Sequence, residues 1–100
     1  MQDLILLHSH FEPHVGSDFT VVGDNGATLP LTLTAVERGR ASGYSGQARD
    51  PFTLIFQSAV PEAIPQGGYV FRHAAMGEVE IFFGPFNRND EGVQYAASFN

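Results

Sequence analysis

Apolar side chains recur at every second position along most of this sequence. In the segment "TLPLTLTAV" (28–36), the three leucines and Ala35 fall on one side, while the threonines and Pro30 fall on the other. A period of two is typical of a β-strand with one buried face, whereas an amphipathic helix needs a period near 3.6 residues. The pattern predicts that the chain is all-β, with helical spacing confined to its beginning.

The alternation predicts six strands, at residues 18–23, 28–36, 51–57, 69–73, 78–84 and 93–100. Asp24, Asn25 and Gly26 tolerate the positive φ of a tight turn, so we expect the first two strands to form a β-hairpin. Between the last two strands, "NRNDEG" (87–92) is predicted to be a polar turn. Six short strands in hairpin order favour a small six-stranded antiparallel barrel or sandwich.

A chain of 100 residues is expected to form one domain, spanning 1–100, because a shorter unit would bury too little surface. Residues 37–50 lack periodicity and carry three glycines and three arginines, which predicts a long mobile loop. Near the start, Leu4, Leu7 and Phe11 follow helical spacing until Pro13. We therefore expect a short N-terminal helix within 3–12 that caps the open end of the barrel.

The charge of the chain disfavours several classes of partner. Eleven acidic residues against five basic ones give a net charge of −6, which repels nucleic acid and anionic lipid surfaces. The apolar run near the N-terminus follows Asp3 and no basic residue, and it is too short to span a bilayer. We expect no nucleic-acid or membrane partner and no signal peptide, so that the chain is cytoplasmic at synthesis. Its final compartment stays open, and the lack of cysteine excludes thiolate chemistry.

The segment "LHSHFEPHVG" (7–16) contains three of the four histidines, and the fourth lies far along the chain. On a strand His8 and His10 would share a face, whereas on a helix His10 would meet His14. A metal-dependent β-barrel enzyme that uses His8, His10, His14 and His73 is therefore an alternative. We favour a surface cluster, because the neighbouring apolar residues are the groups expected to dock. No metal, other cofactor or catalytic residue is predicted, since no nucleophile or phosphate-binding motif accompanies the histidines.

Aromatic residues exceed what the predicted core can hold. Nine Phe and three Tyr are present, whereas the inward positions hold about six or seven such rings. Some rings are therefore expected at the surface, where aromatic side chains are typical of interfaces. The candidates are Tyr44, Phe82, Phe86 and Tyr95.

Several stretches together resemble a family of bacterial domains. They are "HFEPHVGSDFTV", "LPLTLTAVE", "DPFTLIFQ", "IPQGGYVFRHAAMGEVEIFFGPF" and "VQYAASFN". The chain is similar in these landmarks to an uncharacterised family of all-β domains of unknown function that are associated with phage-tail-collar-like proteins. The resemblance implies an accessory or adaptor part of a fibre or other assembly, and it assigns no site residues.

The hypothesis that follows is a non-catalytic protein-interaction or structural accessory module, with a protein partner bound through strand edges and exposed aromatic rings. Self-association into a homo-oligomer remains open. Besides the metal-dependent enzyme, a carbohydrate-binding module is an alternative, with Tyr44, Phe82 or Phe86 as a stacking platform.

Overall fold

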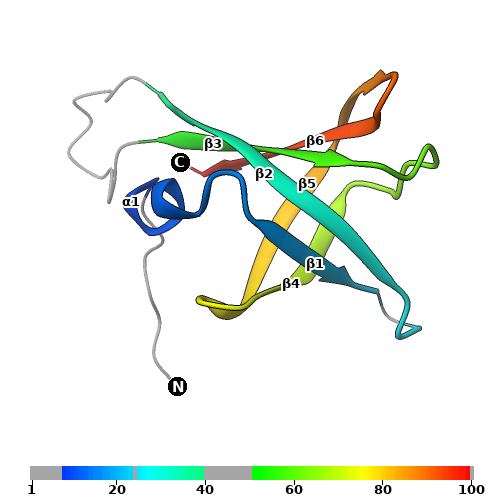
Figure 1. Ribbon diagram of the computed structural model, residues 1–100, viewed down its shortest axis with the longest axis horizontal. Coiled ribbons are helices and arrows are strands. Elements are labelled where there is room, and N and C mark those ends of the chain that lie inside the picture. Colours follow the sequence, from blue (N-terminus) through cyan, green and yellow to red (C-terminus); the bar gives the residue numbers. More distant parts are fainter. Residues whose placement is uncertain (1–7, 24, 40–50, 100) are drawn as a thin grey trace.

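The computed structural model describes residues 8–23, 25–39 and 51–99. A short helix and a 3₁₀ turn precede six strands (Figure 1). These elements are α1 (His8–Phe11), η1 (Glu12–His14), β1 (Asp18–Val22), β2 (Thr28–Arg38), β3 (Phe52–Ser58), β4 (Gly67–His73), β5 (Gly77–Asn89) and β6 (Gly92–Phe99). The predicted all-β class is confirmed.

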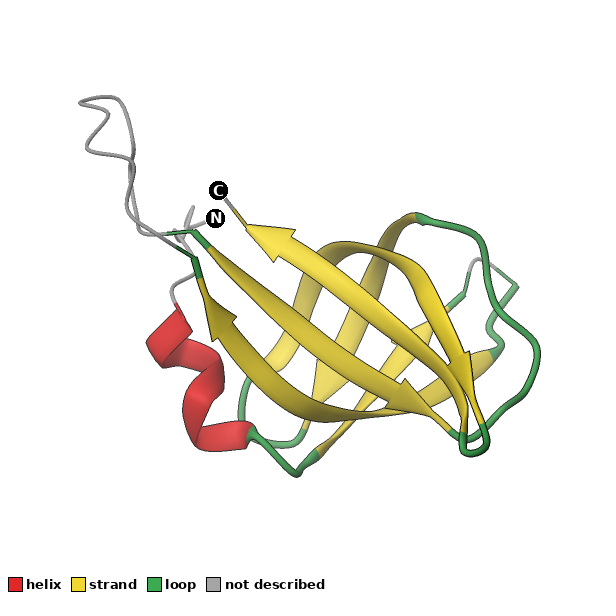
Figure 2. Ribbon diagram, turned by 90° about the horizontal axis from the view of Figure 1, so that it is seen from above, coloured by secondary structure: helices red, strands yellow, loops and turns green. Residues whose placement is uncertain are grey.

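All neighbouring strands are antiparallel, and they follow the order β1-β2-β3-β6-β5-β4. Pairing of β1 with β4 closes this order into a barrel, which decides between the two predicted architectures. Because β3 and β4 are not neighbours, residues 59–66 must cross one end of the barrel to connect them, and Figure 2 shows the strands wrapping around a common interior.

The first two strands form the predicted hairpin. Phe19 pairs with Leu31 and Val21 with Leu29, so that apolar partners face the interior together. Gly26 has a φ of 84°, in the left-handed region that glycine adopts without a steric penalty.

A β-bulge changes the inward face of β2. The register shifts between Leu33 and Ala35, so Ala35 pairs with Ile55 on the outer face while Val36 packs against the core. The prediction that Ala35 faces the core is therefore wrong. The strand also continues to Arg38, which corrects the predicted start of the loop at residue 37, and positions 40–50 lie outside the described residues.

Strand β5 is longer than predicted. It continues through Asn89, so the turn predicted at 87–92 is reduced to its last residues, around Asp90 and Glu91. The first half of the strand, Gly77–Phe83, pairs with β4, whereas the second half, Gly84–Asn89, pairs with β6. A register shift between Pro85 and Asn87 marks a second bulge.

The N-terminal helix is confirmed, although it ends earlier than predicted. α1 stops at Phe11 and the chain continues as η1, which contains Pro13; positions 3–7 are outside the described residues. Phe11 is fully buried, with its ring centroid 6.0 Å from that of Phe52 and 5.9 Å from that of Phe99. One aromatic side chain thus closes the α1 end of the barrel, as in other small barrels whose interior is filled by side chains.

Candidate functional site

Two phenylalanine rings of β5 lie on the surface. Phe82 is 62% exposed and Phe86 54% exposed, as the sequence predicted for both. Phe82 points outward because its neighbours Ile81 and Phe83 fill the core. Phe86 occupies the bulge after Pro85, and bulges commonly redirect a side chain at functional sites.

Two of the residues paired with this part of β5 are small. Gly68 lies opposite Phe82, and Ala96 lies opposite Gly84. A shallow hollow of about 340 Å³ adjoins the second ring and is lined by Ala63, Pro85, Phe86, Asn87, Arg88 and Val93. We call the two rings and Arg88 the β5 surface. Arg88 makes no salt bridge within the described part of the chain.

The structure does not show exposure for the other two aromatic candidates, Tyr95 and Tyr44. Tyr95 is fully buried, so the prediction that it is exposed is wrong. Its ring faces inward on β6, 5.0 Å from that of Phe83, and its hydroxyl accepts a 3.1 Å hydrogen bond from the backbone N–H of Ile64. A buried tyrosine needs such a partner for its polar end. Tyr44 lies outside the described residues.

His73 is held by a complete set of hydrogen bonds. Its Nδ1 accepts the backbone N–H groups of Ala75 at 3.0 Å and Met76 at 3.3 Å. The proton of the neutral ring therefore lies on Nε2, which is 2.9 Å from the Ser17 hydroxyl. That hydroxyl in turn donates to the carbonyl of His14 at 2.6 Å. The imidazole links the β4–β5 turn to the segment before β1, which is a structural role.

Two factors lower the pKa of His73 below its ordinary value of 6.5. Burial is the larger, and the charge of His14, whose ring centroid lies 4.5 Å away, is the second. Protonation of Nδ1 would also replace this acceptor by a donor that faces two backbone N–H donors, so both hydrogen bonds would be lost.

We expect the free energy of unfolding to fall as the pH drops below about 6.5. The folded pKa of His73 is depressed, so the unfolded chain binds more protons in this range, and stability rises with pH. The stabilisation is complete above the unfolded pKa and is lost as the pH falls through the folded one. Urea unfolding between about pH 5 and 8 measures the effect, and His73→Gln should remove this histidine's share of it. An unchanged pH profile in the variant would show that another group is responsible.

A second cluster of contacts in the N-terminal segment centres on Glu12. One carboxylate oxygen of Glu12 lies 3.2 Å from His8 Nδ1 and 3.2 Å from Arg38 Nε. Desolvation alone would raise the pKa of Glu12, but the contacts with Arg38 and His8 outweigh it and hold the pKa below its usual value. The Arg38–Glu12 pair attaches η1 to the end of β2, and the His8–Glu12 contact links α1 to η1.

The four histidines are not brought together. His14 lies beside His73, whereas His8 contacts Glu12. The three described segments contain no group of three or more His, Cys, Asp or Glu side chains placed to hold a metal ion. The metal-enzyme alternative therefore has no site in this part of the chain.

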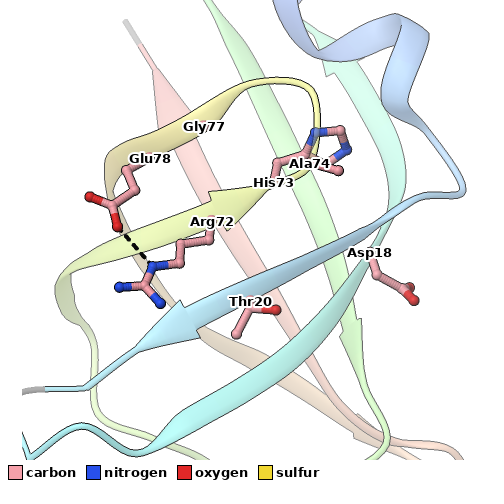
Figure 3. A pocket seen from close by; sticks show the side chains of 7 residues that line it. All are labelled: Asp18, Thr20, Arg72, His73, Ala74, Gly77 and Glu78. Atoms are coloured by element: carbon pink, nitrogen blue, oxygen red, sulfur yellow. Dashed lines mark hydrogen bonds and ion pairs between the residues drawn. The ribbon is translucent and has the colours of Figure 1, made fainter.

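A hollow of about 370 Å³ lies on the outer surface near the β4–β5 turn, and its lining includes three charged residues (Figure 3). Arg72 Nε lies 2.8 Å from Glu78 Oε2, so each of the two charges has a partner of opposite sign. The Asp18 carboxylate lies apart from this pair and accepts a hydrogen bond from Thr32 at 2.9 Å. The two carboxylates do not face each other, as the acid pair of a glycoside hydrolase does across its cleft.

These features define a small all-β barrel domain with an exposed aromatic surface. No helix in the described residues has the length and apolar character needed to cross a membrane. The chain belongs to the family described as Domain of unknown function (DUF6916), whose model matches residues 6–99. Membership of an uncharacterised family, as the sequence resemblance implied, is thus confirmed. No curated protein and no solved structure matches the chain significantly.

Proposed function

We propose that this chain is a non-catalytic protein-binding module whose contact region is the β5 surface. The observation that carries the proposal is the exposure of Phe82 and Phe86 on a single strand. Burying one such ring contributes about 1.5–3 kcal/mol of favourable free energy. In the isolated barrel neither ring is buried, so this free energy is gained only when a partner covers them. Large aromatic side chains in this position are typical of interface anchors.

The backbone of β5 favours recognition through its face over addition of a strand to its edge. Beyond Phe83 the strand pairs only with β6 among the described residues, so one edge of Gly84–Asn89 has no strand partner. Pro85 lacks the N–H that an added strand requires, and the adjacent bulge disturbs its register. The sequence favours binding through both strand edges and aromatic rings, and we assign the larger part of the binding to the rings.

An accessory role in a larger assembly is a specific form of this proposal. The family resemblance suggests an adaptor or subunit of a phage-tail-like or fibre assembly, in which copies of a small barrel contact one another or a neighbouring protein. The mass of the particle in solution, measured alone and after co-expression with proteins from neighbouring genes, tests this form of the proposal.

We expect the double substitution Phe82→Ser and Phe86→Ser to weaken association with the partner, or self-association, by more than tenfold. Loss of two anchors typically costs more than about 1.4 kcal/mol of binding free energy, which corresponds to tenfold. Unfolding should change little, because both rings are exposed. Size-exclusion chromatography with light scattering measures the assembly, and urea unfolding measures stability.

Val15→Ser is the matched control, since Val15 is 46% exposed and follows η1, outside the β5 surface. It should leave association unchanged. If the double variant assembles as well as the unsubstituted protein, the proposal that the β5 surface mediates binding is refuted. The proposal also fails if the chain neither self-associates nor binds any protein encoded by the neighbouring genes. A glycan array on the same variants tests the carbohydrate-binding alternative: saturable sugar binding that requires Phe82 or Phe86 would replace the protein-binding proposal.

A further inference from the structure

The end of the barrel opposite α1 contains an apolar pocket of about 390 Å³. It lies between the β1–β2 hairpin and the segment 59–66 that crosses from β3 to β4. None of the described lining residues belongs to β5, so this pocket is distinct from the β5 surface. Mouths of β-barrels are common ligand sites, and this volume falls at the lower end of the range for small-molecule pockets.

The inner wall of the pocket belongs to the packed core. Val21 and Leu29 are buried there, and Val60 and Ile64 pack against the core from the crossing segment. The ring of Tyr69 is fixed on both sides: it stands at 86° to the ring of Phe83, and its hydroxyl donates to the carbonyl of Pro65 at 2.8 Å. The apolar wall is therefore formed before any ligand arrives, which lowers the entropic cost of binding.

Among the described residues that line the pocket, Glu62 is the only charged one, and its side chain makes no salt bridge with another described residue. The net charge of the chain is also −6. An anion entering the pocket would meet repulsion with no compensating cation among the described lining residues, whereas an ammonium group would meet a carboxylate and an aromatic ring.

We propose that this pocket binds a small amphiphilic amine. The apolar part of the ligand rests on Leu29 and Ile64, and its ammonium group lies at the rim beside Glu62. The apolar wall supplies affinity, and the Glu62 carboxylate supplies selectivity for a cation over a neutral or anionic molecule of the same shape.

Titration of the full chain with benzylamine, benzyl alcohol and benzoate, followed by amide NMR shifts, tests this proposal. The three probes share one ring and differ in charge. Benzylamine should saturate with a dissociation constant on the order of 1 mM, as expected for so small a ligand. Benzyl alcohol should bind about threefold or more weakly, and benzoate about tenfold or more weakly, because only the head group changes. Shifts should concentrate at Gly23, Ala27 and Tyr69, which line the pocket.

Two variants separate the charge from the cavity. Glu62→Gln should bring the affinity for benzylamine down to that for benzyl alcohol, while the affinity for the alcohol stays the same. Ala27→Leu places added bulk at the pocket and should weaken both ligands severalfold, whereas Ala75→Leu, at an exposed site in the β4–β5 turn, should weaken neither. Absence of saturation with benzylamine, or equal binding of benzoate, would overturn the proposal, and so would binding that survives Ala27→Leu unchanged.

Discussion

Replacing Phe11 by alanine is expected to lower the free energy of unfolding by about 3–5 kcal/mol. The side chain is fully buried between Phe52 and Phe99, whose own rings stack at 4.6 Å and 6°. Truncation removes apolar burial and leaves a void that the strand ends cannot close, because their backbones are paired in the barrel. Urea unfolding followed by circular dichroism gives the difference directly.

A domain of this size has about 5–15 kcal/mol of stability in total, so the variant should lose a large fraction of it. Val15→Ala is the control, since Val15 is exposed and follows the same short helical segment. It should change stability by less than about 0.5 kcal/mol. A loss below about 1 kcal/mol for Phe11→Ala would mean that the N-terminal segment is not part of the core.

Gly92→Ala is expected to destabilise the barrel by more than about 3 kcal/mol. Gly92 has a φ of 137°, a backbone conformation that residues other than glycine rarely adopt. A Cβ at this position would also collide with the carbonyl oxygen of Ser58. That oxygen cannot move away easily, because Ser58 pairs with Val93 in the β3–β6 ladder. Thermal unfolding measures the loss.

Gly26→Ala separates the two causes. Gly26 also has a positive φ, 84°, but an added Cβ there would meet nothing within 4 Å. Only the conformational penalty remains, about 1–2 kcal/mol. Equal losses at the two glycines would show that the contact with Ser58 is relieved at little cost, and that backbone conformation alone explains the effect.

The strand pattern was predictable because burial on one face leaves a period of two in the sequence. Phe19, Leu31 and Phe56 all follow it, and all are buried. The errors lie where the chain departs from regular geometry. The bulge after Leu33 turns Ala35 outward, and no residue type in "TLTAV" signals it, because the register shift depends on the partner strand.

In the candidate sites, too, the features that follow from local strand geometry were predictable and those that depend on distant segments were not. The exposure of Phe82 could be predicted because it lies between two inward-facing residues. The exposure of Phe86 could be predicted because the chain has more aromatic rings than its core can hold. Tyr95 was misplaced as an exposed ring because a tyrosine tolerates either environment. Burial requires a partner for its hydroxyl, and the backbone N–H of Ile64, thirty-one positions away, became that partner only on folding. The pocket beside Glu62 had no signal in the sequence.

By itself, the sequence determined the strand class, the hairpin at Asn25 and Gly26, and the short helix with an apolar residue at Phe11. These are local properties, fixed by side-chain periodicity and by the conformations that glycine and proline permit. Only the tertiary structure decided that β3 pairs with β6 instead of β4. That choice joins segments distant in the chain, so it depends on how whole faces pack against one another, and it also creates the crossing segment and the pocket beneath it.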